Sequence, residues 1–427
     1  MSASPSPLSQ SADSDIFVWR SGLALLTFAA SLGTLLRYIF LGEVPGLSYK
    51  AILNAHSNTA LFGWMSLILL HLLGRTFTPT TGGGKAYRRL AWAFVLAQTA
   101  ASAALLVEGY TLVSSLALSA VVTVSLVWSG RLASDMWKKG NLWGDLRKRF
   151  AASSLLFQMT SVIALAVGLG AKSFDIGGPK VFYLFVQLFL HLQFGGWLLF
   201  GISALLVNWA IKHGATLSPG ILRVYWWCLF LSTPPTYALA VSWMEPDWFV
   251  YLINTAGSLL HLAAGVAMLL LILRSENLRL PRTGMTGWLL RLAVCFLGVK
   301  FCLVAACASP QVAEFGLSFR GFVIAFVHLI TLGIATLLYW GLALDSGYLS
   351  STRLTTAGSW LFLINLAATE ALLLGHGLAV IFGWGHLPGY YAALFAAAAG
   401  MAFGTALWTV SAFRCSSPKA AKTNPMG

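Results

Sequence analysis

The chain has 427 residues, of which 58% are hydrophobic and 9% are charged, with a formal net charge of +14. Its mean hydropathy is +0.78, and its charged fraction is well below the roughly 25% of soluble domains. The composition therefore excludes a soluble protein and predicts the lipid bilayer as its partner. The positive charge does not indicate nucleic acid, because Lys and Arg lie between the apolar runs, as they do in membrane proteins.

A membrane-spanning helix needs about 20 apolar residues, and runs of this kind predict twelve spans. In chain order they cover about residues 17–41, 50–74, 88–107, 110–134, 150–170, 181–211, 221–243, 248–273, 286–307, 318–343, 355–382 and 388–413. We therefore expect an all-α bundle of about twelve transmembrane helices in one domain, residues 16–413, between disordered segments at 1–15 and 414–427. No convincing internal repeat is evident.

The basic residues predict an orientation. They concentrate in the even-numbered loops, which hold Arg75, Lys85, Arg88, Arg89, Lys138, Lys139, Arg147, Lys148 and Arg149 among others. The positive-inside rule then places both termini in the cytoplasm of a multi-pass protein of a bacterial-type inner membrane. The N-terminal residues lack the basic region of a cleavable signal peptide. No CxxCH motif is present, so covalent attachment of haem is not expected.

Three histidines lie inside long apolar runs: His56, His191 and His328. An ionisable side chain in the hydrocarbon layer is costly and usually functional, and neutral imidazole is a common ligand of haem iron. At 1.5 Å per residue they lie roughly 9 to 15 Å below the outer ends of the second, sixth and tenth spans. These spans run in the same direction, so their histidines can converge on one buried haem b. The alternative for each histidine is a hydrogen bond to a neighbouring carbonyl.

Two arginines near the outer membrane face, Arg37 and Arg320, are candidate partners of haem propionates. Their alternative role is to extend toward the lipid headgroups. His261 and His376 are secondary ligand candidates in the eighth and eleventh spans.

Lys300 and Glu370 lie deep in the ninth and eleventh spans. Intramembrane ionisable groups of this kind can relay protons. The two side chains can equally pair with each other or with the backbone.

Several stretches carry a resemblance to a known family. They are Asn54-Ala55-His56-Ser57-Asn58 with Phe62-Gly63-Trp64, then Phe189 to Trp197, then Phe319 to Ile324 leading to His328-Leu329 and Leu332-Gly333. With twelve spans, they resemble subunit I of the haem–copper oxidases, and more closely a divergent group of subunit I-like membrane proteins. The resemblance implies that His56 and His328 are haem ligands and that His191 is a copper ligand. It also implies an electron-donor cytochrome or a partner membrane subunit.

The chain departs from the oxidase pattern at the copper site. The oxidases carry two adjacent histidines in the seventh span, where this chain reads Cys228 to Pro235, and a His-x-His pair in the tenth span, where it has only His328. Gly195 replaces the tyrosine of the sixth span. We therefore expect one haem, copper that is absent or sub-stoichiometric, and a redox or gas-ligand role related to O2 or NO. If the protein is an enzyme, it is an oxidoreductase of the haem–copper oxidase or nitric oxide reductase type.

Other functions stay open at this stage. The NnrS family of nitric-oxide-response haem proteins is similar in its second-span histidine followed by Leu61-Phe62-Gly63, although its His-Ala-His-Glu-Met signature is absent. A cofactor-free transporter needs broken helices around a polar site in mid-membrane. Thr233-Pro234-Pro235-Thr236 is the one strong break in the sequence, and it has no symmetric counterpart. An assembly or structural membrane protein on the same scaffold is the remaining alternative.

Overall fold

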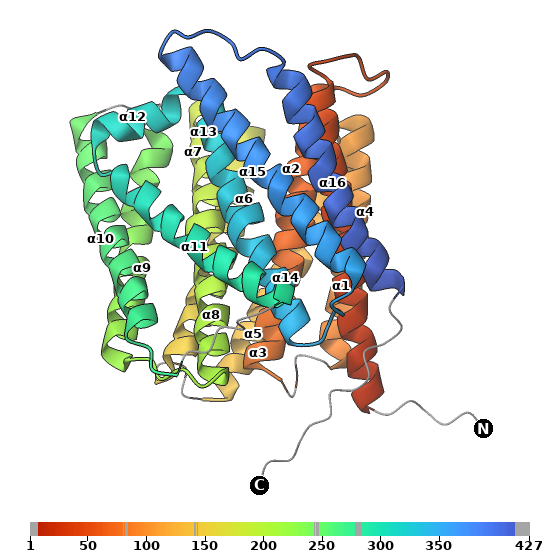
Figure 1. Ribbon diagram of the computed structural model, residues 1–427, viewed down its shortest axis with the longest axis vertical. Coiled ribbons are helices and arrows are strands. Elements are labelled where there is room, and N and C mark those ends of the chain that lie inside the picture. Colours follow the sequence, from red (N-terminus) through yellow and green to blue (C-terminus); the bar gives the residue numbers. More distant parts are fainter. Residues whose placement is uncertain are drawn as a thin grey trace.

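The computed structural model describes residues 7–414, except 80, 82, 83, 141, 143, 243, 245, 246 and 278–283. These residues form a bundle of long helices (Figure 1), and one isolated bridge between Thr216 and Glu276 is the only β pairing among them. The predicted all-α fold is confirmed. Residues 1–6 and 415–427 lie outside the described part, so the disorder predicted there stays a prediction.

The helices follow the predicted spans closely. They are α1 (Pro7–Tyr38), α2 (Tyr49–Asn58), η1 (Thr59–Ser66), α3 (Leu67–Phe77), α4 (Lys85–Glu108), α5 (Leu112–Lys138), α6 (Leu146–Ser173), α7 (Gly178–His191), η2 (Leu192–Leu198), α8 (Leu199–Lys212), α9 (Pro219–Val241), α10 (Trp248–Leu273), α11 (Gly284–Ala306), α12 (Pro310–Ser318), α13 (Arg320–His328), η3 (Leu329–Thr336), α14 (Leu337–Asp345), α15 (Arg353–Ile381) and α16 (Tyr390–Arg414). Helix α1 begins at Pro7, within the segment that the sequence predicts to be disordered.

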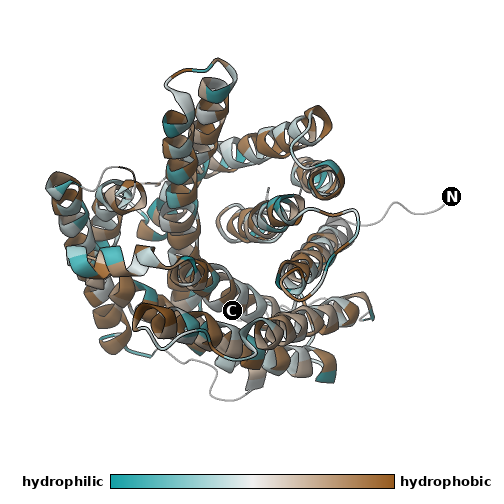
Figure 2. Ribbon diagram, turned by 90° about the horizontal axis from the view of Figure 1, so that it is seen from above, coloured by the Kyte–Doolittle hydropathy of each residue, from teal (hydrophilic) through white to brown (hydrophobic). Residues whose placement is uncertain are grey.

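Within the described residues, eleven helices are long and apolar enough to cross a membrane. The remaining predicted span, the seventh at 221–243, coincides with α9, a helix of 23 residues that carries Pro234 and Pro235 in its interior. Large apolar side chains such as Leu116, Leu252 and Ile364 remain more than half exposed on the outside of the bundle. Seen from above, hydrophobic residues cover much of the outer face of the bundle (Figure 2), as expected of a multi-pass membrane protein.

The second and sixth spans form the centre of the bundle. In their most apolar windows, 83% and 67% of the residues are buried, against 28% for the span formed by α5. The tenth span, with 56%, also packs into this centre. Each of these three spans is built from two α-helices joined by a π-helical segment: η1, η2 and η3 respectively.

The π-helical segments begin within three residues after the three intramembrane histidines. His56 precedes η1 by three residues, and η2 and η3 start at the residue after His191 and after His328. A π-helix bonds i to i+5 and is rare, short and frequent at functional sites. The structure therefore repeats one feature every four spans, although the sequence shows no convincing repeat.

Hydroxyl groups and tryptophans join the three segments in the core. Ser66 and Thr336 each donate to the carbonyl five residues earlier, at 3.0 and 2.9 Å. The same hydroxyl oxygens accept hydrogen bonds from other spans: Trp197 donates to Ser66 at 3.3 Å, and Trp64 donates to Thr336 at 2.9 Å. All four side chains are buried, so these bonds fix the relative heights of the second, sixth and tenth spans.

Candidate functional site

The Trp64–Thr336 bond places two of the histidines at one level. Trp64 follows His56 by eight residues, and Thr336 follows His328 by eight residues. The second and tenth spans are parallel, so equal offsets from a shared contact give equal depths. His56 and His328 also lie within electrostatic range of each other. The matched depth predicted from the sequence therefore has a structural basis in the contact between η1 and η3.

The ring of His56 is held from behind by α1. Its Nδ1 lies 2.8 Å from the carbonyl oxygen of Ala29, so Nδ1 carries the proton and donates. A Cβ on Gly33 would lie 3.0 Å from the His56 ring, so a larger residue there would require the ring to shift by a few tenths of an ångström. Nε2 has no hydrogen-bond partner among the described residues. A histidine whose Nδ1–H donates to a carbonyl presents Nε2 as a ligand.

The ring of His328 is held in the same way by a carboxylate. Its Nδ1 lies 3.2 Å from Oε1 of Glu370 on α15, and its Nε2 likewise has no hydrogen-bond partner in the described part of the chain. The side chains of His328 and Glu370 are 18% and 23% accessible although both lie inside predicted spans. An imidazole anchored at Nδ1 by a carboxylate is a common arrangement of metal-bound histidines.

The two arginines lie close to this pair. Arg37 is within electrostatic range of Arg320 and Glu370, and also of the hydroxyl groups of Tyr49 and Tyr390. Arg37 is partly buried and Arg320 is exposed. Arg37 is also within electrostatic range of His56. Its guanidinium group, with that of Arg320 nearby, makes this region suited to an anion.

His191 does not present its ring in the same way. Its Nε2 lies 2.7 Å from the carbonyl oxygen of Thr233 on α9, and its ring centroid is 5.7 Å from that of Tyr237. Thr233 directly precedes Pro234 and Pro235, which lack backbone N–H groups. The structure thus shows for His191 the hydrogen bond to a carbonyl that the sequence left open as an alternative.

His261 and Lys300 form a buried pair that the sequence did not reveal. Lys300 Nζ lies 2.7 Å from His261 Nε2, and His261 Nδ1 lies 3.2 Å from the hydroxyl oxygen of Ser232. The exposed fractions of Lys300, His261 and Ser232 are 3%, 4% and 0%. Lys300 and Glu370 therefore do not pair with each other, because each bonds a different histidine.

His376 lies apart from the other candidates. Its Nε2 is 3.4 Å from Nδ1 of His386, and its ring stacks on Tyr390 with 3.8 Å between centroids. It follows Glu370 by six residues on α15, a rise of roughly 9 Å. His376 thus belongs to a cluster near the end of α15 and does not join His56 and His328.

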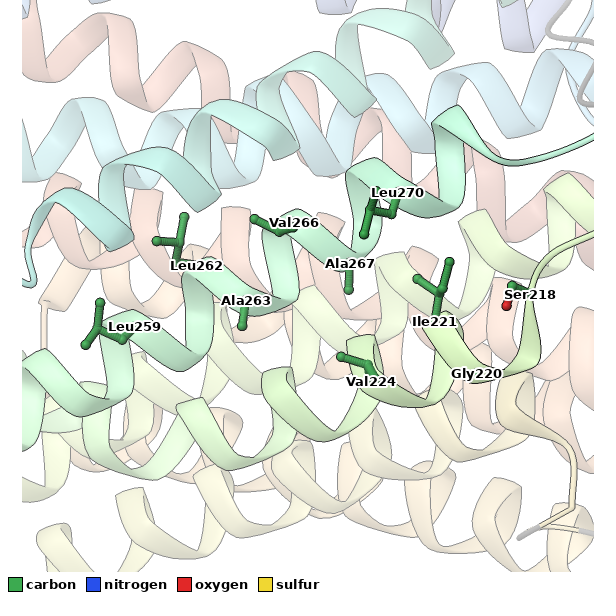
Figure 3. A pocket seen from close by; sticks show the side chains of 10 residues that line it. All are labelled: Ser218, Gly220, Ile221, Val224, Leu259, Leu262, Ala263, Val266, Ala267 and Leu270. Atoms are coloured by element: carbon green, nitrogen blue, oxygen red, sulfur yellow. The ribbon is translucent and has the colours of Figure 1, made fainter.

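A groove between α9 and α10 has a volume of about 660 Å³ (Figure 3). It is lined by Ser218, Gly220, Ile221, Val224, Leu259, Leu262, Ala263, Val266, Ala267 and Leu270. No titratable side chain lines it, and Val224, Leu259 and Val266 are about half exposed on the outside of the bundle. The groove faces lipid and offers no group for redox chemistry.

Among the described residues, no group of three or more His, Cys, Asp or Glu side chains is arranged to hold a metal ion. An oxidase-type copper site needs three imidazoles, and in the described part of the chain His261 is the one imidazole within electrostatic range of His191. The expectation of absent or sub-stoichiometric copper stays a prediction.

Comparison with known proteins places the fold. No family model matches the sequence, and no curated protein sequence matches it. The chain is similar to a solved cryo-EM structure of a haem–copper terminal oxidase dimer, with a TM-score of 0.69 and 12% sequence identity over 93% of this chain and 83% of that chain. At this identity the likeness shows the fold alone, and it confirms the subunit I-like architecture. The resemblance to the NnrS family stays a prediction.

Proposed function

We propose that the chain is a membrane redox protein that binds one haem b between the second and tenth spans, with His56 and His328 as axial ligands. The observation that carries this proposal is the matched anchoring of the two rings. Each donates from Nδ1 to a fixed oxygen, each leaves Nε2 without a hydrogen-bond partner among the described residues, and both stand at one depth. Two histidines with purely structural roles would need neither the same tautomer nor the same depth.

The protein groups around the rings have distinct roles. The carbonyl of Ala29 fixes the tautomer and orientation of His56. The carboxylate of Glu370 does the same for His328 and, being negative, makes that imidazole a stronger donor. Arg37 and Arg320 are placed to neutralise propionate groups, and the surrounding apolar helices exclude water.

Bound haem would supply a one-electron redox centre and a position for a small gas such as O2 or NO. The electron donor would be a cytochrome or a partner membrane subunit. The basic loops support an inner-membrane orientation with cytoplasmic termini. An NnrS-like response to nitric oxide is the variant of this function in which gas binding is the output.

The test is a pyridine haemochrome assay on protein expressed with ample haem. We expect about one haem b per chain, and loss of the low-spin spectrum in His56→Ala and in His328→Ala, since the other histidine at a similar depth, His191, bonds the Thr233 carbonyl. His213→Ala is the matched control, because His213 lies at the end of α8 and its ring bonds the carbonyl of Trp209. Haem that persists unchanged in both ligand variants, or no haem in the wild type, would contradict the proposal.

A further inference from the structure

The buried pair of Lys300 and His261 has no role in the proposed haem site. Lys300 is on α11, His261 on α10 and Ser232 on α9, so three neighbouring helices contribute one side chain each. No carboxylate of the described residues lies within electrostatic range of the Lys300 amine. A lysine in a membrane interior without a counterion is costly and demands a specific explanation.

The hydrogen bonds of the triad are self-consistent when the amine is protonated. Lys300 Nζ then donates to His261 Nε2 at 2.7 Å, His261 donates from Nδ1 to the Ser232 oxygen at 3.2 Å, and Ser232 donates to the carbonyl of Leu229 at 2.8 Å. The ammonium also lies 5.5 Å from the centroid of the Phe301 ring, a distance at which an aromatic face stabilises a cation.

The same heavy-atom positions also suit the neutral amine. The His261 ring then takes the other tautomer and donates from Nε2 to the lone pair of Lys300. The Ser232 hydroxyl rotates from the Leu229 carbonyl to donate to His261 Nδ1. Hydroxyl rotation and tautomer exchange move only protons, so the triad accommodates one proton more or less without rearranging the packed helices.

The surroundings contain few other titratable groups. His191 on α7 is within electrostatic range of Lys300 and of His261, and its Nε2 bonds the carbonyl of Thr233. Tyr225 on α9 packs its ring against Phe301 and bonds Ser203, and Tyr339 on α14 bonds the carbonyl of Met65. Both tyrosine hydroxyls are thus engaged elsewhere, and the exchangeable proton of this region belongs to Lys300 and His261.

We propose that Lys300, His261 and Ser232 form a proton-holding site inside the membrane, which takes up and releases one proton between the Lys300 amine and its surroundings. Phe296, one helical turn before Lys300, packs against Gly333 in η3, five residues after His328. If the proposed haem is present, the electron that reduces it adds negative charge near η3, and this charge favours proton uptake by Lys300. This second statement rests on the proposed function.

The first test needs no haem. Protein labelled with 15N-lysine is placed in liposomes, and the amine signals are recorded by solid-state NMR between about pH 5 and pH 10, the span from strongly buried to free lysine amines. The difference from Lys300→Met isolates the Lys300 signal. We expect it to change between the charged and neutral positions within this range. A Lys300 signal that keeps one position throughout would overturn the proposal and leave the triad a structural contact between helices.

The second test uses haem-loaded protein. We expect the midpoint potential to vary with pH by up to about 59 mV per pH unit, the value for one proton per electron. Both Lys300→Met and Lys300→Arg remove this pH dependence. The neutral methionine lowers the midpoint potential, whereas the permanently charged arginine raises it. The exposed Lys85→Met is the control and leaves the slope unchanged. A wild-type slope retained in both Lys300 variants would refute the coupling, whereas absence of haem would refute only the proposed function.

Discussion

Two regions of the bundle contain imidazoles packed next to other helices, yet they differ in what the rings bond. In the first region, His56 and His328 donate from Nδ1 to a carbonyl and to a carboxylate. In the second, His191 directs Nε2 to a carbonyl, and both nitrogens of His261 bond side chains. The partner atoms therefore decide what a membrane histidine does, because they determine which nitrogen, if any, remains to bind a metal.

The comparison is sharpest at Glu370. Glu370→Ala removes the acceptor that orients His328, and loss of such a partner typically costs 10- to 100-fold in affinity for the bound metal group. We expect haem occupancy to fall accordingly in a titration of the apoprotein with haem, while Glu370→Gln, which keeps an acceptor oxygen, retains more. Equal affinity in the wild type and the alanine variant would show that the carboxylate does not support a ligand.

An effect on stability is expected where helices of the two regions are joined. Thr336→Val leaves the buried Trp64 Nε1 without its acceptor, which costs about 1–3 kcal/mol of unfolding free energy. Equilibrium unfolding in SDS measures this loss. Thr331→Val is the matched control, because the hydroxyl of Thr331 donates to the Val327 carbonyl of its own span and makes no bond to another helix of the described residues. If both variants lose the same stability, the interhelical bond contributes nothing specific.

The smallest effect on haem is expected in the second region. His191→Ala removes a bond to α9 but no proposed ligand, so the haem content and low-spin spectrum should equal those of the wild type. Metal analysis should give well under one copper per chain in both proteins. If the wild type held one copper per chain and His191→Ala lost it, both regions would bind a metal. The prediction of absent or sub-stoichiometric copper would then be wrong.

Much of the fold could be predicted because apolar runs of sufficient length directly predict spans, and all twelve runs form helices. The histidines of the second, sixth and tenth spans could be singled out because ionisable side chains are rare inside such runs. Their backbone partners could not be predicted, since Ala29 and Thr233 lie on other helices and are ordinary residues in sequence. The pairing of Lys300 with His261 depends in the same way on how α10 and α11 face each other.

The three π-helical segments impose a constraint on chain length at the centre of the molecule. In a plain α-helix, the side chains of residues eight positions apart point in directions that differ by roughly 80° around the helix axis. A π-helical turn absorbs one extra residue, so this angle falls to roughly 20° in the opposite sense. His56 and Trp64 can thus both face the tenth span, as can His328 and Thr336 toward the second. Deleting one residue from η1 would therefore turn either the imidazole or the indole away from its partner. The chain should tolerate substitutions there better than any change in the number of residues.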